Sequence, residues 1–227
     1  LLGSAITLTF PTHPIIVAQQ SAIVAGLAEG RFRLGIGPGS PTGIKDSFGI
    51  NFRKPLGHLK EYIRITKSLL QTGSVAFDGD YYSAHGNIPH PVNVPVMISA
   101  LGPRSFELSG RESDGAISWL CPSEYMSTIA LTNITNGANE ANREVPPIVA
   151  HLPICFSNDL TLVRKAMMKR FGYMASSPVY KSVFNAMGFP EIDDGVCTPE
   201  MVNATVAWGT NNQIGDRIMA MLSSGMS

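Results

Sequence analysis

Apolar runs of about strand length alternate along this chain with longer stretches in which apolar residues recur at helical spacing. Leu2 to Leu8 predicts a strand, and a Pro-rich turn closes it. Ile15 to Ala28 predicts a helix, because its apolar residues return every three or four positions. Phe32 to Gly37 predicts the next strand. Pro55 to Leu70 then predicts a long helix with one apolar face, ended by Gly73.

The alternation continues to the end of the chain after one interruption. Residues 74–93 are a polar excursion, predicted to be a hairpin with a turn at Asp78-Gly79. The strands expected beyond it are Val94–Leu101, Gly115–Leu120 and Pro147–Phe156, and the expected helices are Ser105–Arg111, Ser123–Arg143, Leu160–Tyr173, Ser176–Met187 and Pro199–Leu222. Apolar strands that are each followed by a helix indicate a parallel sheet covered by helices. Periodicity alone fits both an open doubly wound sheet and a barrel.

Composition excludes some partners. Seventeen basic and seventeen acidic side chains cancel, so we expect neither nucleic acid nor an anionic membrane to be attracted. The longest apolar runs fall short of the roughly 20 residues that span a bilayer. Cys121, Cys155 and Cys197 are far apart and odd in number, which favours buried thiols in a reducing cytoplasm and gives no metal site. The chain begins at Leu1, inside a predicted strand, and we expect it to be a single domain, 1–227, of a longer protein.

The run Gly35-Ile36-Gly37-Pro38-Gly39-Ser40 is the first candidate ligand site. A dinucleotide fingerprint needs a third glycine where Ser40 stands, and it needs a helix directly after the loop. The sequence continues with Pro41-Thr42-Gly43, which we expect to be a loop, so the fingerprint fails. A glycine-lined loop at the carboxyl end of a parallel strand is still a place where ligands bind.

Two further segments are rich in small residues. Ser99-Ala100-Leu101-Gly102-Pro103-Arg104 ends a strand and opens a helix, whose first amides and Arg104 would suit a phosphate. Gly3-Ser4-Ala5 lies inside an apolar strand, where a glycine often marks a bulge or a close approach to a ligand.

Aromatic and histidine residues give weaker signals. Trp119 ends a strand on the expected ligand side and is a candidate substrate contact. His58 is expected on the surface of its helix, and His151 is expected to be a satisfied histidine of the core. His85 and His90 show no metal-ligand spacing, and we assign neither a metal nor a catalytic residue.

Taken together, several segments resemble a known family. L-G-S-A-I-T-L-T-F-P-T-H-P, then A-Q-Q, then G-R-F-R-L-G-I-G-P-G are similar to the third and fourth βα units of luciferase-like monooxygenases. F-R-K-P-L-G-H-L-K-E-Y-I-R-I-T-K-S-L-L and F-D-G-D-Y-Y continue the likeness. P-V-M-I-S-A-L-G-P-R-S-F-E-L-S-G-R-E-S-D-G-A-I-S-W resembles the fifth unit and the sixth strand, in the version of members that use the deazaflavin coenzyme F420.

The resemblance implies an α/β fold, a TIM (β/α)₈ barrel that lacks its first two βα units and its last strand in this chain. It implies a non-prolyl cis peptide at Ser4–Ala5 behind the coenzyme ring. The coenzyme-binding residues that it implies are Ser4, Ala5, Thr7, Gly37, Pro38, Gly39, Ser40, Ser99, Ala100, Leu101, Gly102 and Pro103. Ser40 stands where some relatives carry an acidic or histidine catalytic residue, so proton donation from this place is not expected. The family also implies a homodimer.

The function expected from this resemblance is F420-dependent hydride transfer to or from a small organic substrate. One alternative is an FMN-dependent monooxygenase. Another is a non-catalytic flavin-binding protein with an incomplete barrel, and a Rossmann dehydrogenase ranks last because its fingerprint fails. The segment from Tyr173 to Val196 is expected to form a lid, on position alone.

Overall fold

A curled parallel sheet organises the molecule. The structure is a computed structural model that describes residues 1–172, 177–189 and 198–226. The strands of the sheet follow the order β1-β3-β6-β7-β8, and β2 continues β1 along β3. Their bounds are Leu2–Gly3 for β1, Thr7–Leu8 for β2, Phe32–Gly37 for β3, Val96–Ser99 for β6, Ala116–Trp119 for β7 and Ile148–His151 for β8. All these pairs are parallel, as the apolar strands predicted. An isolated parallel bridge joins Ile148 to Met226.

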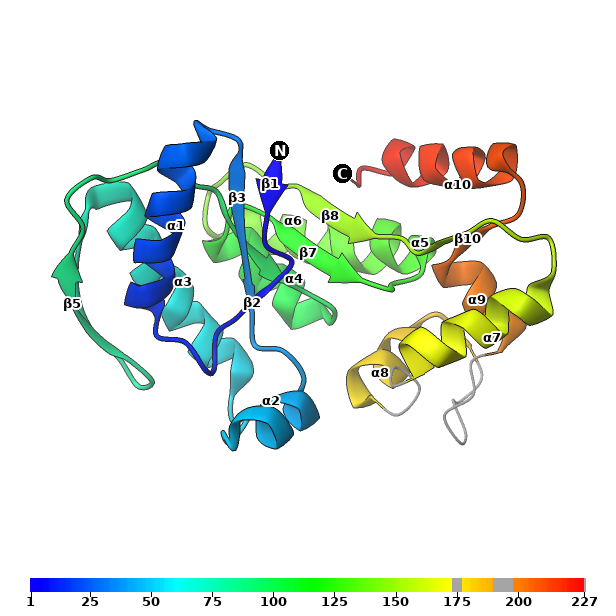
Figure 1. The fold of residues 1–227 in the computed structure, drawn as a ribbon, viewed down its shortest axis with the longest axis horizontal. Coiled ribbons are helices and arrows are strands. Elements are labelled where there is room, and N and C mark those ends of the chain that lie inside the picture. The colour runs from blue at the N-terminus through cyan, green and yellow to red at the C-terminus, as the bar shows by residue number, and fades with distance from the viewer. Residues whose placement is uncertain (173–176, 190–197, 227) are drawn as a thin grey trace.

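Helices cover one face of this sheet (Figure 1). α1 (Pro14–Ala28) and α3 (Pro55–Thr72) lie against β3 and β6, while α4 (Pro103–Glu112) and α6 (Leu131–Glu140) lie behind β7 and β8. The core beneath α1 and α3 includes Leu34, Ile36 and Ile98, none more than 2% exposed. Burial of this apolar face is what holds the helices to the sheet.

One predicted loop is a helix. α2 (Pro41–Phe48) follows β3 after only three residues. The hydroxyl of Ser40 caps it by accepting a hydrogen bond from the Gly43 amide at 3.1 Å, and Pro41 occupies the first turn. Gly49, at φ 67°, ends it in the left-handed conformation. The expectation of a loop at Pro41-Thr42-Gly43 was wrong because the Ser-Pro start signal outweighed a glycine in the first turn.

The predicted hairpin is present, but its turn begins one residue later than the expected Asp78-Gly79, because Asp78 still pairs with Ser83. β4 (Ser74–Asp78) pairs antiparallel with β5 (Ser83–Asn87), and four residues, 79–82, connect them. The carboxylate of Glu61 on α3 accepts hydrogen bonds from the amides of Asp80, Tyr81 and Tyr82 at 2.8–3.0 Å. The hairpin is thereby tied to the helix.

The C-terminal part differs from the sequence expectation in two elements, the first of which is the strand expected over Pro147–Phe156, divided here into β8 and β9 (Ile154–Cys155) in separate sheets. β8 leads through β9 into α7 (Leu160–Phe171), and α8 (Pro178–Ala186) and α9 (Pro199–Thr205) follow. A single helix was expected from Pro199 to Leu222, but β10 (Ala207–Trp208) separates α9 from α10 (Asn211–Ser223) and pairs with β9. A capping box of Thr210 and Gln213 starts the new helix.

The remaining connections are short. α5 (Ser123–Tyr125) and a π-helical turn, η1 (Met126–Ala130), run directly into α6.

Of the segment expected as a lid, the structure describes residues 177–189, which contain α8. Residues 173–176 and 190–196 lie outside the described part. Among the described residues, no helix is long and apolar enough to cross a membrane.

Candidate functional site

The inner face of the sheet, opposite the helices, carries the candidate site. Paired residues of parallel strands point to the same side, and successive residues alternate. Because Leu34 and Ile36 point into the helix-covered core, Gly35 and Gly37 point inward. The registers extend this inward set across the neighbouring strands to Met97, Ser99, Ile117, Trp119, Val149 and His151.

β3 presents no side chain to this inner face at Gly35 or Gly37. A Cβ added at Gly35 would overlap the carbonyl oxygen of Ser4 and lie 2.5 Å from the Cδ1 of Ile117. At Gly37 it would overlap the Cδ1 of Ile6 and the hydroxyl of Ser99. The glycines of the G-I-G-P-G run therefore repeat with the period of a strand and let the neighbouring segments pack directly against the backbone of β3.

The segment between β1 and β2 forms a bulge against this strip. Gly3 pairs with Arg33 and Thr7 with Ile36, so three residues, 4–6, face two, 34–35. The hydroxyl of Ser4 completes the ladder: it donates to the Gly35 carbonyl at 2.8 Å and accepts from the Gly35 amide at 3.0 Å. The small Gly3-Ser4-Ala5 triplet thus marks a bulge, one of the two readings of its glycine.

The cis peptide lies one residue later than the resemblance implied. It joins Ala5 to Ile6. The expectation of Ser4–Ala5 was wrong, because Ser4 still follows the ladder: its amide donates to the Arg33 carbonyl and its hydroxyl bonds Gly35. The chain leaves the ladder only after Ser4.

The candidate coenzyme-binding residues at the carboxyl ends of β2 and β3 lie on different sides of the sheet. Gly39, at φ 76°, lies close to Leu8, since a Cβ there would be 2.7 Å from the Cδ2 of Leu8. Ser40 caps α2 just beyond. Thr7 pairs with Ile36 and so shares the helix-covered side of the strand rather than the inner face. Gly37 and Gly39 therefore lie beside the segment that contains the bulge, whereas Thr7 lies on the helix-covered side of the sheet.

The carboxyl end of β6 leads into the first turn of α4. Gly102 is the N-cap and makes no side-chain capping bond, and Pro103 begins the helix. The hydroxyl of Ser105 accepts from the Leu101 amide at 3.1 Å and donates to the Gly102 carbonyl at 2.7 Å. Tyr125 donates to the Leu101 carbonyl at 3.0 Å. The loop is therefore fixed, and the helix start offers backbone amides and a partial positive charge to an anion.

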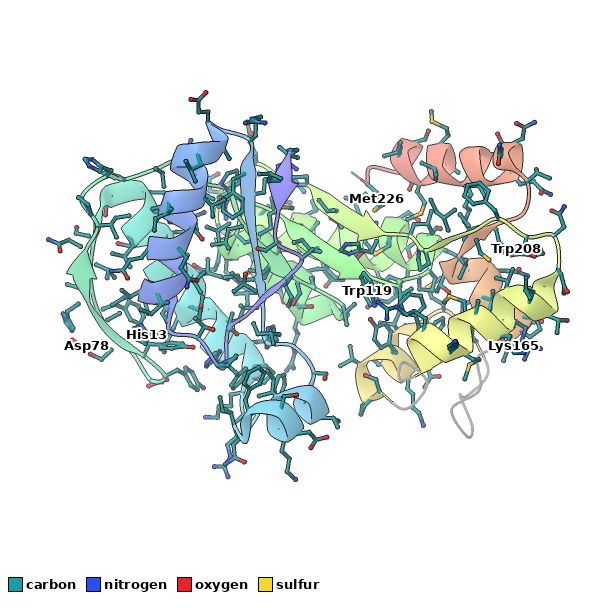
Figure 2. All side chains as sticks on the ribbon, in the orientation of Figure 1. His13, Asp78, Trp119, Lys165, Trp208 and Met226 are labelled. Atoms are coloured by element: carbon teal, nitrogen blue, oxygen red, sulfur yellow. The ribbon has the colours of Figure 1, made fainter. Side chains whose placement is uncertain are left out.

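Aromatic residues line the other end of the inner face. Figure 2 shows Trp119 at the end of β7, where the sheet meets the α7–α8 group. Its ring makes edge contacts with His151, with centroids 4.6 Å apart, and with Phe171 at 5.8 Å. Tyr180 on α8 donates a hydrogen bond to the Trp119 carbonyl at 3.0 Å.

His151 was missed by sequence reasoning, which assigned it to the core. It is half-buried at the carboxyl end of β8. Its Nδ1 lies 3.0 Å from the Ser118 carbonyl, which can only accept, so Nδ1 donates the hydrogen bond. Two signals could have found it: its place at a strand end, and its pairing with Trp119 on the neighbouring strand.

A cavity of about 190 Å³ runs from Leu1, Leu2 and Arg33 at the amino-terminal ends of the strands, past the bulge, to His151. Ser4, Ala5, Gly35, Ile117 and His151 are among its lining residues. A flat ring needs a backbone surface to lie on, and a phosphate needs free amides. The bulge of small residues at Ser4 and Ala5 supplies the first and the start of α4 the second, so these residues fit a flavin-type coenzyme. The described residues hold no group of three side chains suited to a metal ion.

His58 lies on the helix-covered side and was expected on the surface, which was wrong. It is only 8% exposed because Phe10 stacks on its ring at 4.0 Å and Tyr82 bonds its Nε2 at 2.6 Å. Loss of hydration on burial lowers the pKa of His58 from its ordinary value, and nearby Glu61 opposes this effect. Nδ1 of His58 and the hydroxyls of Thr9 and Tyr62 are buried without a hydrogen-bond partner.

Comparison with known proteins agrees with this arrangement. The profile of the luciferase-like monooxygenase family matches residues 1–227. The chain belongs to this family. It is 30% identical over 161 residues to 5,10-methylenetetrahydromethanopterin reductase of Methanolobus tindarius, a match that covers 70% of this chain and 48% of the relative. It is 33% identical over 169 residues to F420-dependent glucose-6-phosphate dehydrogenase of Mycobacterium tuberculosis, covering 70% of this chain and 50% of the relative.

Solved structures share the fold of this chain. An F420-dependent secondary alcohol dehydrogenase superposes with a TM-score of 0.81 at 17% identity, over 99% of this chain and 71% of that one. The F420-dependent tetrahydromethanopterin reductase of Methanopyrus kandleri gives 0.73 at 20% identity, over 99% and 74%. The FMN complex of the oxygenating constituent of 3,6-diketocamphane monooxygenase from Pseudomonas putida gives 0.69 at 14% identity, over 98% and 70%. The chain spans about half the length of the curated relatives that it matches.

Proposed function

We propose that the protein is an oxidoreductase that transfers a hydride between coenzyme F420 and a small organic substrate. The observation that carries this proposal is the Ser4–Ile6 bulge, which packs against Gly35 and Gly37 on the inner face of the sheet. Similarity to the F420-dependent glucose-6-phosphate dehydrogenase of Mycobacterium tuberculosis supports F420 over other coenzymes.

Each part of the site has a role in this proposal. The bulge at Ser4 and Ala5 would back the coenzyme ring, and the loop Gly37-Pro38-Gly39-Ser40 would border it. Ser99 to Pro103 would lie along its phosphate side, where the start of α4 offers amides. The bound deazaflavin supplies hydride chemistry; the protein orients the ring and excludes water. Trp119 would contact the substrate.

FMN-dependent oxygenation is the second candidate. The structural likeness to a monooxygenase constituent solved in complex with FMN favours it. Binding without turnover, as in a flavoprotein with an incomplete barrel, is a possible outcome of the same experiment.

The proposal also covers the domain organisation, the oligomeric state and the cellular compartment of the protein. We propose a single domain, 1–227, and a homodimer in the cytoplasm that binds no nucleic acid. The cysteines support a reducing compartment, since Cys121 is free and its burial raises the pKa of its thiol to about 12. Exposed Ile16, Ile23 and Leu27 on α1 offer an apolar face to a second subunit.

A titration of the full-length protein tests the coenzyme. F420 and FMN would be added separately, with binding followed by fluorescence quenching and calorimetry. Micromolar or tighter binding of F420 alone supports the proposal. Preference for FMN, with oxygen consumption, would move the protein to the monooxygenases. Tight binding without any redox turnover would make it a non-catalytic flavin protein, and binding of neither would contradict the coenzyme altogether.

A further inference from the structure

We propose that His58, Tyr82 and Thr9 form an acid-sensitive clasp, which ties the carboxyl end of β3 to the β4–β5 hairpin and opens when His58 takes up a proton. These residues lie apart from those assigned to the coenzyme. The clasp is a property of the folded chain alone. Its effect on the coenzyme rests on the proposed function, because the loop that begins at Gly37 would border the bound ring.

A chain of hydrogen bonds runs from His58 to this loop. The Tyr82 hydroxyl lies 2.6 Å from Nε2 of His58, and it donates to the Thr9 carbonyl at 3.3 Å. The Thr9 amide donates in turn to the Gly37 carbonyl at 2.9 Å. Thr9 is 0% exposed, so water does not compete for its two backbone bonds. The hairpin therefore holds the residue that follows β2, and this residue holds the end of β3.

Stacked rings keep the imidazole in place. Phe10 directly follows Thr9, and its ring lies face to face with His58, with centroids 4.0 Å apart and planes within 5°. Phe52, in the connection between α2 and α3, stacks on Phe10 at 4.8 Å. Because this cover leaves His58 only 8% exposed, a charged imidazole would lose hydration that the rings do not replace.

The hydrogen bonds of the clasp suit a neutral imidazole and not a charged one. In the neutral form Nε2–H donates to the Tyr82 oxygen, and the hydroxyl hydrogen goes to the Thr9 carbonyl. Nδ1 is then a lone pair, and it has no hydrogen-bond partner among the described residues. A second proton would create a buried N–H at Nδ1 without an acceptor. The charged ring is therefore favoured only outside the stack, and its departure breaks the bond to Tyr82.

Titratable groups face this imidazole from three elements. They are Glu61 and Tyr62 on its own helix, Tyr81 and Tyr82 on the hairpin loop, and His13 at the start of α1, whose ring meets that of Tyr82 at 5.5 Å. Burial raises the pKa of Tyr62 and of Tyr82, so both stay neutral in acid. Burial lowers the pKa of His58, and the charge of Glu61 opposes this effect.

Linkage gives the clasp a measurable effect in both directions. If the proton on His58 loosens the loop at Gly37, it weakens coenzyme binding, and the bound coenzyme must then oppose proton uptake by the same factor. We expect the Kd for F420 to rise at least about fivefold between pH 7 and pH 5. We also expect saturating F420 to move the titration midpoint of His58 to lower pH.

The free protein tests the clasp without any coenzyme. The imidazole signals of the five histidines would be followed by NMR on histidine-labelled, full-length protein, and His58→Gln identifies the signal of His58. We expect this signal to be displaced upfield by the Phe10 ring, to titrate below the ordinary pKa of imidazole and to lose the displacement as it titrates. A midpoint at the ordinary value, or a displacement that survives protonation, would overturn the clasp.

Calorimetry with F420 at pH 7 and pH 5 tests the coupling. His58→Gln cannot titrate but keeps a hydrogen-bonding group for Tyr82, and its Kd should stay within about twofold of its value at pH 7. Tyr82→Phe cuts the link to Thr9 and should bring the two Kd values closer together than in the wild type. His13→Asn, which keeps a capping side chain at the start of α1, is the matched control and should behave like the wild type. Melting temperatures at both pH values show that each variant is folded.

The outcomes separate the clasp from the proposed function. Equal pH dependence in His58→Gln and the wild type, or a His58 midpoint that F420 does not move, would contradict the coupling while leaving F420 as the coenzyme. Loss of the pH dependence in His13→Asn would assign the proton to His13 instead. A wild type that binds no F420 at either pH would contradict the proposed function and the coupling together, and the NMR titration would still decide whether the clasp exists.

Discussion

The two faces of β3 differ in the size of the side chains that they carry. On the outer face, Leu34 and Ile36 fill the space beneath α1 and α3 and are at most 2% exposed. On the inner face, the alternate positions are Gly35 and Gly37, where the space for a Cβ is already taken by Ser4, Ile6 and Ser99. The outer face stabilises the fold by burial under helices, whereas the inner face receives the bulge that would back the coenzyme ring. A single strand thus separates stability from function by the direction of its side chains.

The largest expected effect follows from adding one methyl group to the inner face at Gly35. Gly35→Ala would press a Cβ against the Ser4 carbonyl, which is backbone and cannot turn away. We expect a loss of roughly 3 kcal/mol in the free energy of unfolding, measured by urea denaturation. Gly26→Ala on α1 is the matched control, because nothing lies within 4 Å of its Cβ. Equal stability of the two variants would show that the bulge does not need Gly35.

Adjacent residues sharpen the comparison. Gly37→Ala pushes Ile6 and Ser99 toward the cavity, and we expect it to weaken F420 binding at least tenfold, or about 1.4 kcal/mol. Ile36→Val removes one outer methyl and should cost about 1 kcal/mol of stability with the Kd unchanged. Calorimetry gives both Kd values. If Ile36→Val weakens binding as much as Gly37→Ala, the two faces are not independent.

The smallest effect concerns acid stability on the outer side. The pKa of His58 is lowered in the folded protein, so the unfolded chain, with a pKa near 6.5, takes up the proton first. Stability therefore falls as the pH drops below about 6.5 toward the folded pKa. His58→Asn should show a smaller drop in melting temperature between pH 7 and pH 5 than the wild type. An identical slope for His58→Asn would mean that carboxylates alone set the acid response.

The sequence determined more of the fold than of the site. Strand and helix periodicity predicted β3, α1, α3 and the β4–β5 hairpin, because apolar spacing follows directly from which face is buried. It did not find α2 or β10, whose short runs depend on caps and on a partner strand far along the chain. Resemblance to the family pointed to the glycine loops, but it placed the cis peptide one residue early.

Only the tertiary structure decided which residues face one another. The glycines at 35 and 37 are visible in the sequence, yet their purpose depends on Ser4, more than thirty residues away. His58 and His151 both stand among apolar neighbours in the chain; one is buried under Phe10 and the other meets Trp119 at a cavity wall. Local pattern fixes the direction of a side chain relative to its own strand, whereas the register of separate strands decides what that side chain meets.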